Sequence, residues 1–155
     1  MSGKQHVQAL MRAIGPQLGL LEVTEFEAES TWTLVPDEDS VLFADYDDDA
    51  GGRLMLSAEV GRPAGDDRLR LYELLLRYNN RWPETGGVRM ALDEADDGVV
   101  QLFDLPVADL DLARLQTVVA NFVDVLKAWR EIVAAVPAEP EASSFNPMLG
   151  GMIRG

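Results

Sequence analysis

A helical segment that is apolar around nearly its whole circumference is the strongest constraint that this sequence places on the fold. Residues 69–82 carry Leu, Tyr or Trp at more than half of their positions, and Arg70, Glu73 and Arg77 form only a narrow polar stripe. Pro83 disfavours helical geometry in the residue before it and sets the end of the helix. A chain of 155 residues builds one ordinary core. We therefore expect this helix to lie beneath other elements, or a second chain to cover part of it.

Two other segments repeat apolar residues three or four positions apart, which is the spacing of one helical face. The first runs from residue 5 to about residue 18 and contains Pro16. Because a proline clashes with the preceding turn, we expect this helix to kink or end near Ile14. The second covers about residues 112–133 and follows aspartates that can cap it. Its apolar stripe is broad, which favours packing across a sheet over the narrow seam of a coiled coil.

Shorter segments with β-branched, aromatic or alternating apolar residues predict five strands. They cover residues 30–35, 41–46, 52–60, 88–92 and about 100–102. Acidic turns join the first three as antiparallel hairpins, and Asp97-Gly98 is a strong turn signal between the last two. The predicted order of elements is therefore helix, three-strand meander, helix, hairpin and helix.

The charge balance is strongly acidic. Thirteen Lys and Arg face 27 Asp and Glu, which gives a net charge of −14 and a pI near 4.3. This charge repels phosphate backbones and anionic membrane surfaces, so we expect neither nucleic acid nor a membrane as partner, whereas basic segments of other proteins are attracted. No apolar run approaches the ~20 residues that a membrane-spanning helix needs, and no secretory signal is present, so the expected location is the cytosol.

Residue types that carry catalysis or bind metals are scarce. Cysteine is absent and His6 is the single histidine, which excludes disulfides, thiolate nucleophiles and clustered imidazole metal sites. Alternating aspartates at 45–49 match only the opening of a calcium-binding EF-hand loop, because Leu56 stands where such a loop needs Glu. We expect no enzyme, no metal and no cofactor. The alternatives are an acidic nucleic-acid mimic or other regulatory protein-binding module, and a small carboxylate-dependent enzyme.

Core and turn residues between about residues 65 and 135 form a pattern of order and spacing. It includes Leu74-Leu75-Leu76, Thr85-Gly86-Gly87, Leu105-Pro106, Phe122-Val123 and Trp129-Arg130. Together with size and acidity, this pattern resembles the class I type III secretion chaperones, the Tir chaperone (CesT-like) family. The resemblance implies an α+β homodimer in which each subunit packs three helices on a twisted antiparallel sheet of about five strands, in the order α-β-β-β-α-β-β-α.

The resemblance also implies a function. Members of that family are bacterial cytoplasmic homodimers that hold the N-terminal segment of a secreted effector extended and present it to the export apparatus, with the secretion ATPase as a further implied partner. Such a client would pair its backbone with a strand edge and dock apolar side chains between the strands and the first helix. The candidate effector-binding residues are Val7, Leu10, Met11, Ile14, Trp32, Leu34, Val41 and Phe43. The candidate dimer-interface residues are Leu71, Tyr72, Leu74, Leu75, Tyr78 and Trp82.

Apolar residues return near the end of the sequence, between Phe145 and Ile153, after a stretch rich in Pro, Glu, Ala and Ser. This composition predicts a chaperone domain over residues 1–136 and a flexible tail over residues 137–155. As a hypothesis, the apolar part of the tail lies in a client groove of its own or a neighbouring subunit.

Overall fold

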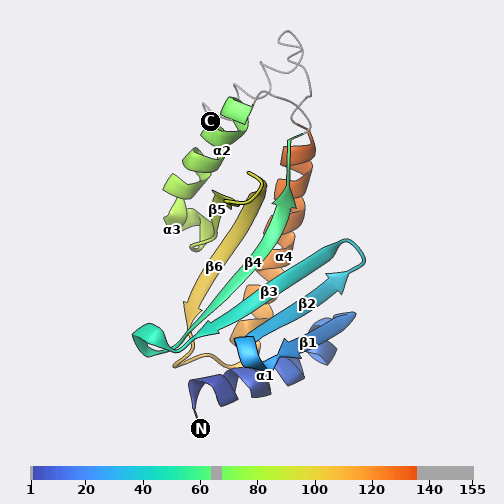
Figure 1. The fold of residues 1–155 in the computed structure, drawn as a ribbon, viewed down its shortest axis with the longest axis vertical. Helices are drawn as coiled ribbons and strands as arrows, with labels where there is room; N and C mark the ends of the chain where they lie inside the picture. Colours follow the sequence, from blue (N-terminus) through green and yellow to red (C-terminus); the bar gives the residue numbers. More distant parts are fainter. Residues whose placement is uncertain (1, 64–67, 136–155) are drawn as a thin grey trace.

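The computed structural model describes residues 2–63 and 68–135, which form an α+β fold around one antiparallel sheet (Figure 1). The six strands are ordered β1-β2-β3-β4-β6-β5 across the sheet. The strands are β1 (Glu22–Phe26), β2 (Thr31–Asp37), β3 (Ser40–Asp47), β4 (Arg53–Gly61), β5 (Arg89–Leu92) and β6 (Val99–Pro106). The helices are α1 (Gly3–Leu18), α2 (Arg68–Asn80), the one-turn α3 (Trp82–Thr85) and α4 (Leu112–Ala134). The fold class expected from the sequence is confirmed, whereas the expected tail lies outside the described residues.

β1 is a strand that the sequence analysis did not predict. Because its five residues include Glu22 and Glu25, the segment shows only a weak form of the apolar alternation that is typical of a half-buried strand. It forms because it pairs antiparallel with β2, from Glu22 opposite Val35 to Phe26 opposite Thr31. The sheet therefore has six strands, and β1 is one of its two edges.

α1 continues past the point at which its proline was expected to break it. The helix runs through Pro16 to Leu18, so the expected end near Ile14 is wrong. Pro16 lies in the last turn, so its missing N–H leaves the carbonyl four residues earlier without its helical partner, and the helix ends two residues later. Gly19, at φ 63°, then ends the helix in the left-handed conformation.

The core lies between one face of the sheet and the two long helices. α1 packs over β1 and β2, and α4 packs over β4 and against α1. The register places Leu34 opposite Leu42 on this face, and both side chains are fully buried. From the helices, the least exposed apolar side chains are Val7, Met11, Ile14, Leu115, Val119, Phe122 and Leu126. Burial of this face provides most of the driving force for folding.

α2 has one covered and one uncovered side. Its inner side reaches α4 through an edge-to-face contact of Tyr78 with Trp129, with ring centroids 5.0 Å apart. The Asn79 amide also holds β5, because it donates to the Met90 carbonyl at 2.8 Å and accepts from the Met90 N–H at 2.9 Å. In contrast, Leu69 and Leu76 are 75% and 69% exposed. Among the described residues, the apolar helix is therefore covered on one side only.

The last turns of α4 are tied to the turn between β2 and β3. The Arg130 guanidinium donates to the Asp39 carbonyl at 2.9 Å, to the Ser40 hydroxyl at 2.7 Å and to the Glu59 carbonyl at 3.1 Å. One turn earlier, the Lys127 ammonium lies 3.2 Å from the Asp37 carboxylate. These contacts join the helix to β2, β3 and β4 at the same end of the sheet.

A second set of charges crosses three strands. The Asp104 carboxylate on β6 accepts hydrogen bonds from Arg89 on β5 at 2.8 Å and from Arg53 on β4 at 2.9 Å. These donors, Arg89 first, lower the pKa of Asp104, although partial burial opposes them. The ionised carboxylate therefore stabilises the folded chain more than the unfolded one.

We expect Arg130→Ala to lower the free energy of unfolding by about 1–2 kcal/mol, because three carbonyl or hydroxyl acceptors lose a charged donor. Urea unfolding followed by circular dichroism measures this change. Arg114→Ala, at an exposed position early in α4, is the control and should have little effect. Equal stabilities of the two variants would contradict the assigned role of Arg130.

We expect Asp104→Asn to destabilise the protein by about 1 kcal/mol near neutral pH. Because the folded-state pKa of Asp104 is lowered, its contribution is present above the unfolded pKa and is lost as the pH falls through the folded pKa. The difference between wild type and variant should therefore shrink as the pH falls below about 4. Urea unfolding at a series of pH values tests this, with the exposed Asp109→Asn as control. A difference that persists undiminished in acid would disprove the assignment.

Candidate functional site

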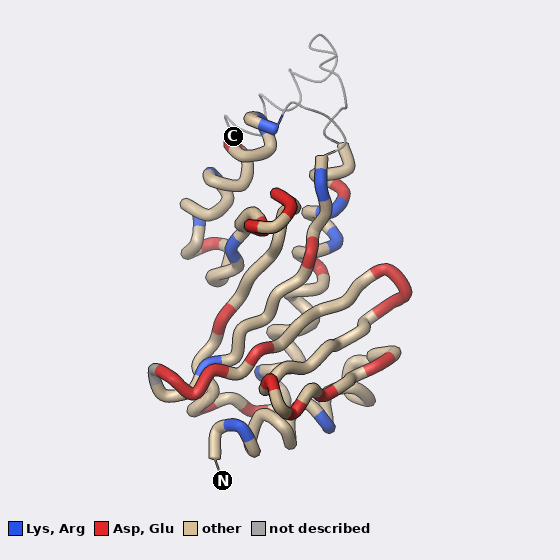
Figure 2. The backbone as a smooth tube through the Cα atoms, in the orientation of Figure 1, with Lys and Arg blue, Asp and Glu red and all other residues tan. Residues whose placement is uncertain are grey.

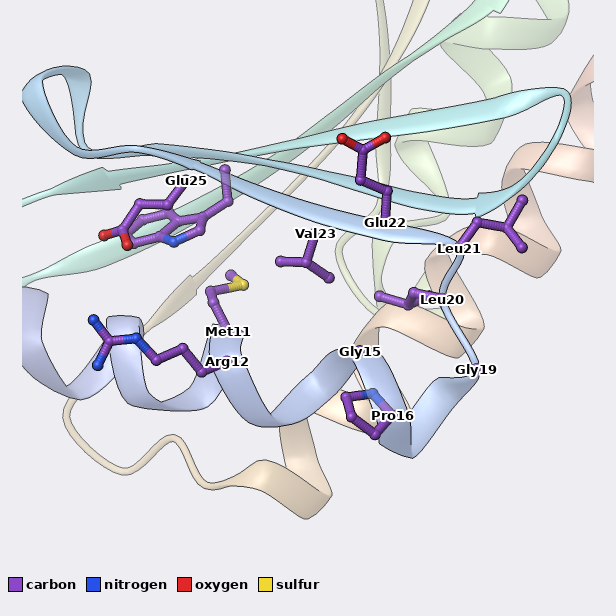
Figure 3. A pocket seen from close by; sticks show the side chains of 11 residues that line it. Met11, Arg12, Gly15, Pro16, Gly19, Leu20, Leu21, Glu22, Val23 and Glu25 are labelled. Carbon is purple, nitrogen blue, oxygen red and sulfur yellow. The ribbon is translucent and has the colours of Figure 1, made fainter.

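A groove lies between the second half of α1 and β1 (Figure 3). Its volume is about 620 Å³. Met11 of α1 and Val23 of β1 project toward each other in it, as Figure 3 shows. Gly15 faces Val23, since a Cβ at this position would be in ordinary van der Waals contact, 3.4 Å from a methyl group of Val23. The lining residues are Met11, Arg12, Gly15, Pro16, Gly19, Leu20, Leu21, Glu22, Val23, Glu25 and Trp32.

The strand that borders the groove has a free edge. β1 pairs with β2 on one side and with no other strand among the described residues. Unpaired N–H and C=O groups along such an edge can pair with an added strand. Apolar side chains flank this edge at both ends, since Leu21 is 63% exposed and Phe26 is 46% exposed. Alternate side chains of an added strand would point to the side of the sheet on which the groove lies.

The surroundings of the groove are acidic. No basic residue occurs between Arg12 and Arg53, and Figure 2 shows acidic residues gathered at the turns of the sheet. Two glutamates of β1 line the groove and are held by neighbours. Gln8 donates to the Glu25 carboxylate at 2.6 Å, and Thr24 donates to the Glu22 carboxylate at 2.8 Å. An extended segment with basic residues would therefore be attracted to this strand.

The candidate effector-binding residues divide into three groups in the structure. Met11 and Trp32 line the groove, although each is only 1% exposed. Four others are 8% exposed or less and belong to the core behind it: Val7, Leu10, Ile14 and Leu34. Val41 and Phe43 are 42% and 43% exposed and alternate along β3 with buried residues. They therefore lie on the opposite face of the sheet from the groove.

The accessible apolar residues of the groove in β1 and directly before it were missed in the sequence. Leu20 and Val23 are half-buried, and Leu21 is exposed, so these side chains are more accessible than those expected on α1. The available signal was the alternation of Leu21 and Val23 directly after the helix-ending Gly19. Two glutamates within the next few positions obscured that alternation.

The candidate dimer-interface residues also point in different directions. Leu71, Leu74 and Leu75 are at most 8% exposed and contribute to the core. Tyr72 and Tyr78 are half-buried, and Trp82 is 65% exposed. The sequence analysis did not single out the two exposed leucines of α2. Leu69, Tyr72 and Leu76 are three and four positions apart, which places them on one side of the helix.

The described residues hold no arrangement typical of a metal centre. Within residues 2–63 and 68–135, no group of three or more His, Asp or Glu side chains could hold a metal ion. The ring of His6 donates from Nε2 to the Leu110 carbonyl, which joins α1 to the loop before α4. Hydrogen bonds from Arg62 and Arg89 lower the pKa of Asp96 and Asp104 respectively, which is opposite to the shift that a general acid needs. No helix in the described ranges is long and apolar enough to cross a membrane.

Several solved structures share this fold, among them chains from three complexes. A chain in the crystal structure of the ExsC–ExsE complex has a TM-score of 0.75 and 20% identity, covering 88% of this chain and 100% of that chain. A chain of the HopA1–SchA chaperone–effector complex has a TM-score of 0.66 and 20% identity, over 83% and 95%. The third is from the Yersinia pestis type III secretion chaperone SycH in complex with a stable fragment of YscM2. It has a TM-score of 0.60 and 25% identity, over 78% and 97%.

The sequence itself matches a protein family. No curated protein matches it significantly. However, the model of the Tir chaperone protein (CesT) family matches residues 9–130, which span the groove, the sheet, α2 and most of α4. The resemblance noted in the sequence is thereby confirmed, and this chain belongs to the Tir chaperone protein (CesT) family.

Proposed function

We propose that this protein is a cytoplasmic type III secretion chaperone. It binds the N-terminal segment of one or more effectors, keeps that segment extended and hands it to the export apparatus, with the secretion ATPase as a further partner. The observation that carries this proposal is the apolar groove beside the free edge of β1, in a chain of the Tir chaperone family. Its role is binding and not catalysis. Two of the similar structures support it, since one is a chaperone–effector complex and another is a type III secretion chaperone with a bound fragment.

The geometry favours binding of an extended client. A client strand would pair its backbone with β1 and place alternate side chains against the groove. Ordering an unfolded segment costs several kcal/mol, so useful affinity needs a large contact area. Val41 and Phe43 lie on the other face of the sheet and would contact a different part of the same client. The net charge of −14 would speed association with a basic client, and salt would weaken this effect.

We also propose that the protein is a homodimer and that α2 lies at its interface. The uncovered side of α2 carries Leu69, Tyr72 and Leu76, and the exposed Trp82 follows as the first residue of α3. A two-fold contact would bury this side against the same side of a second copy. Leu71, Leu74 and Leu75 would fix the position of α2 without contacting the second copy, because they pack into the core of their own subunit. The chaperone domain that we propose over residues 1–136 contains all of these residues.

We expect Leu21→Asp to weaken binding of the client at least tenfold, because a carboxylate would have to be desolvated in the groove. Co-expression with N-terminal segments of type III effectors, followed by pulldown and titration of the retained complex, measures this. Ala128→Asp adds the same charge at an exposed position of α4 and should leave binding unchanged.

Hydrogen exchange on the same complex gives a second readout. The client should protect amides of Glu22–Phe26 in β1 and leave those of the other edge strand, Arg89–Leu92, unchanged. Retention of no effector segment, or full binding by Leu21→Asp, would refute the proposed function.

We expect the full chain to have twice its mass of 17.0 kDa in light scattering. The double variant Leu69→Glu/Leu76→Glu should be a monomer, because four carboxylates would meet in the two-fold contact. Leu21→Glu, which changes an equally exposed leucine far from α2, should remain a dimer. A monomeric wild type, or a dimeric double variant, would rule out this interface.

A further inference from the structure

We propose that the groove between α1 and β1 holds residues 145–153 of the same chain when no client is bound. The structural part of this inference is a contact between the groove and a segment that follows the last described residue, Ala135. Its consequence for regulation rests on the proposed function, because the segment and the client would compete for one groove. Three observations carry it: the uncovered groove, the path from α4 to β1, and the composition of the segment.

The groove exposes apolar surface that no described element covers. Leu21 is 63% exposed, and its neighbours Leu20 and Val23 are only half-buried. Burying such side chains is favourable in proportion to the area removed from water. A segment of the same chain has a large advantage in reaching this surface, since covalent attachment gives it an effective concentration of about 1 mM or more.

The end of α4 is connected to the strand that borders the groove by a short series of contacts. Lys127 contacts Asp37 at 3.2 Å, and Asp37 lies two residues beyond Val35 on β2. The Val35 carbonyl in turn accepts a hydrogen bond at 2.8 Å from the N–H of Leu21, which lines the groove. Leu21 therefore lies near the same end of β2 that the last turns of α4 contact.

The connecting residues are long enough for this path. From Lys127 to Ala135 the chain advances about 12 Å along the helix axis. The Lys127–Asp37 ion pair, with both side chains and the 3.2 Å between them, adds about 13 Å. Two strand residues and one strand spacing add about 12 Å, so the whole path is about 37 Å. Thirteen extended residues from Ala135 to Met148 span about 43 Å, which exceeds this path. Residues 136–147 therefore suffice to bring Met148 to the groove of its own subunit.

The composition of the segment matches the groove. Residues 142–155 contain no acidic side chain and one basic side chain, Arg154, in a chain whose net charge is −14. Glu22 and Glu25 therefore repel this stretch less than they repel other parts of the sequence. Methionine adapts to irregular apolar surfaces. The apolar side chains available are Phe145, Met148, Leu149, Met152 and Ile153.

Occupancy by the segment would weaken the apparent affinity for the client, because the intrinsic association constant is multiplied by the fraction of molecules whose groove is free. It would also cover the unpaired edge of β1, which otherwise can pair with other chains. A genuine client is then one that binds the groove more tightly than the chain's own segment does. The segment thus sets a threshold for client affinity.

A cysteine pair tests the contact directly, because the natural chain contains no cysteine. We expect Leu21→Cys/Met148→Cys, in the full chain without client, to form an intramolecular disulfide under mild oxidation. The control is Val41→Cys/Met148→Cys, since Val41 is also exposed but lies on the opposite face of the sheet. The rate of disulfide formation, followed by mass spectrometry and non-reducing electrophoresis, should be at least tenfold higher for the Leu21 pair.

A variant of the segment completes the test. Leu149→Asp/Ile153→Asp, added to the Leu21 pair, should reduce its rate to that of the control pair. Equal rates for the two pairs, an unchanged rate after these substitutions, or a disulfide that forms mainly between chains would each overturn the proposal. Because no client is present, such a result leaves the proposed function intact. Conversely, undiminished client binding by Leu21→Asp in a chain that also carries Leu149→Asp/Ile153→Asp, where the segment no longer competes, would refute the proposed function and not the contact.

Discussion

Packing of two amphipathic helices on one face of the sheet is the interaction on which the rest of the structure depends. α1 and α4 bury the alternate side chains of the strands, with Leu34, Leu42 and Phe122 almost inaccessible to water. α1 lies over β1 and β2 at one end of the sheet. Because β1 is the last strand there, the same packing that builds the core leaves a groove beside an unpaired strand edge.

Surplus apolar surface and surplus negative charge complement each other in this protein. The uncovered leucines of α2, the apolar residues at the ends of β1 and the outward residues of β3 lie in different parts of the surface, and the described residues leave all of them exposed. Large exposed apolar patches mark interaction sites in soluble proteins. A net charge of −14 keeps copies of the chain from associating without specificity, and it favours partners that are basic or neutral. Both properties suit a protein that binds unfolded segments of other proteins.

Much of the fold followed from local patterns, and the errors have physical causes. The period of α4 and the alternation in β4 are strong, and the structure has both elements close to their expected positions. β1 was missed because two glutamates weaken its pattern and pairing with β2 stabilises it. The effect of Pro16 was overestimated, since α1 continues through it and ends two residues later, at Leu18. The candidate effector-binding residues of α1 lie in the core, where Val7 and Ile14 are completely buried.

The sequence by itself determined the α+β class, the acidic character, the order of most elements and the family pattern, because these depend on periodicity, composition and spacing along the chain. Only the tertiary structure decided which apolar residues are available to a partner. Leu71 and Leu76 are alike in sequence, yet one is fully buried and the other 69% exposed. The difference arises from the direction in which α2 packs against its subunit, and local sequence carries no such information. The position of the groove also depends on tertiary packing, because it forms where α1 lies beside the edge strand β1. The local sequence does not show that these two elements are neighbours.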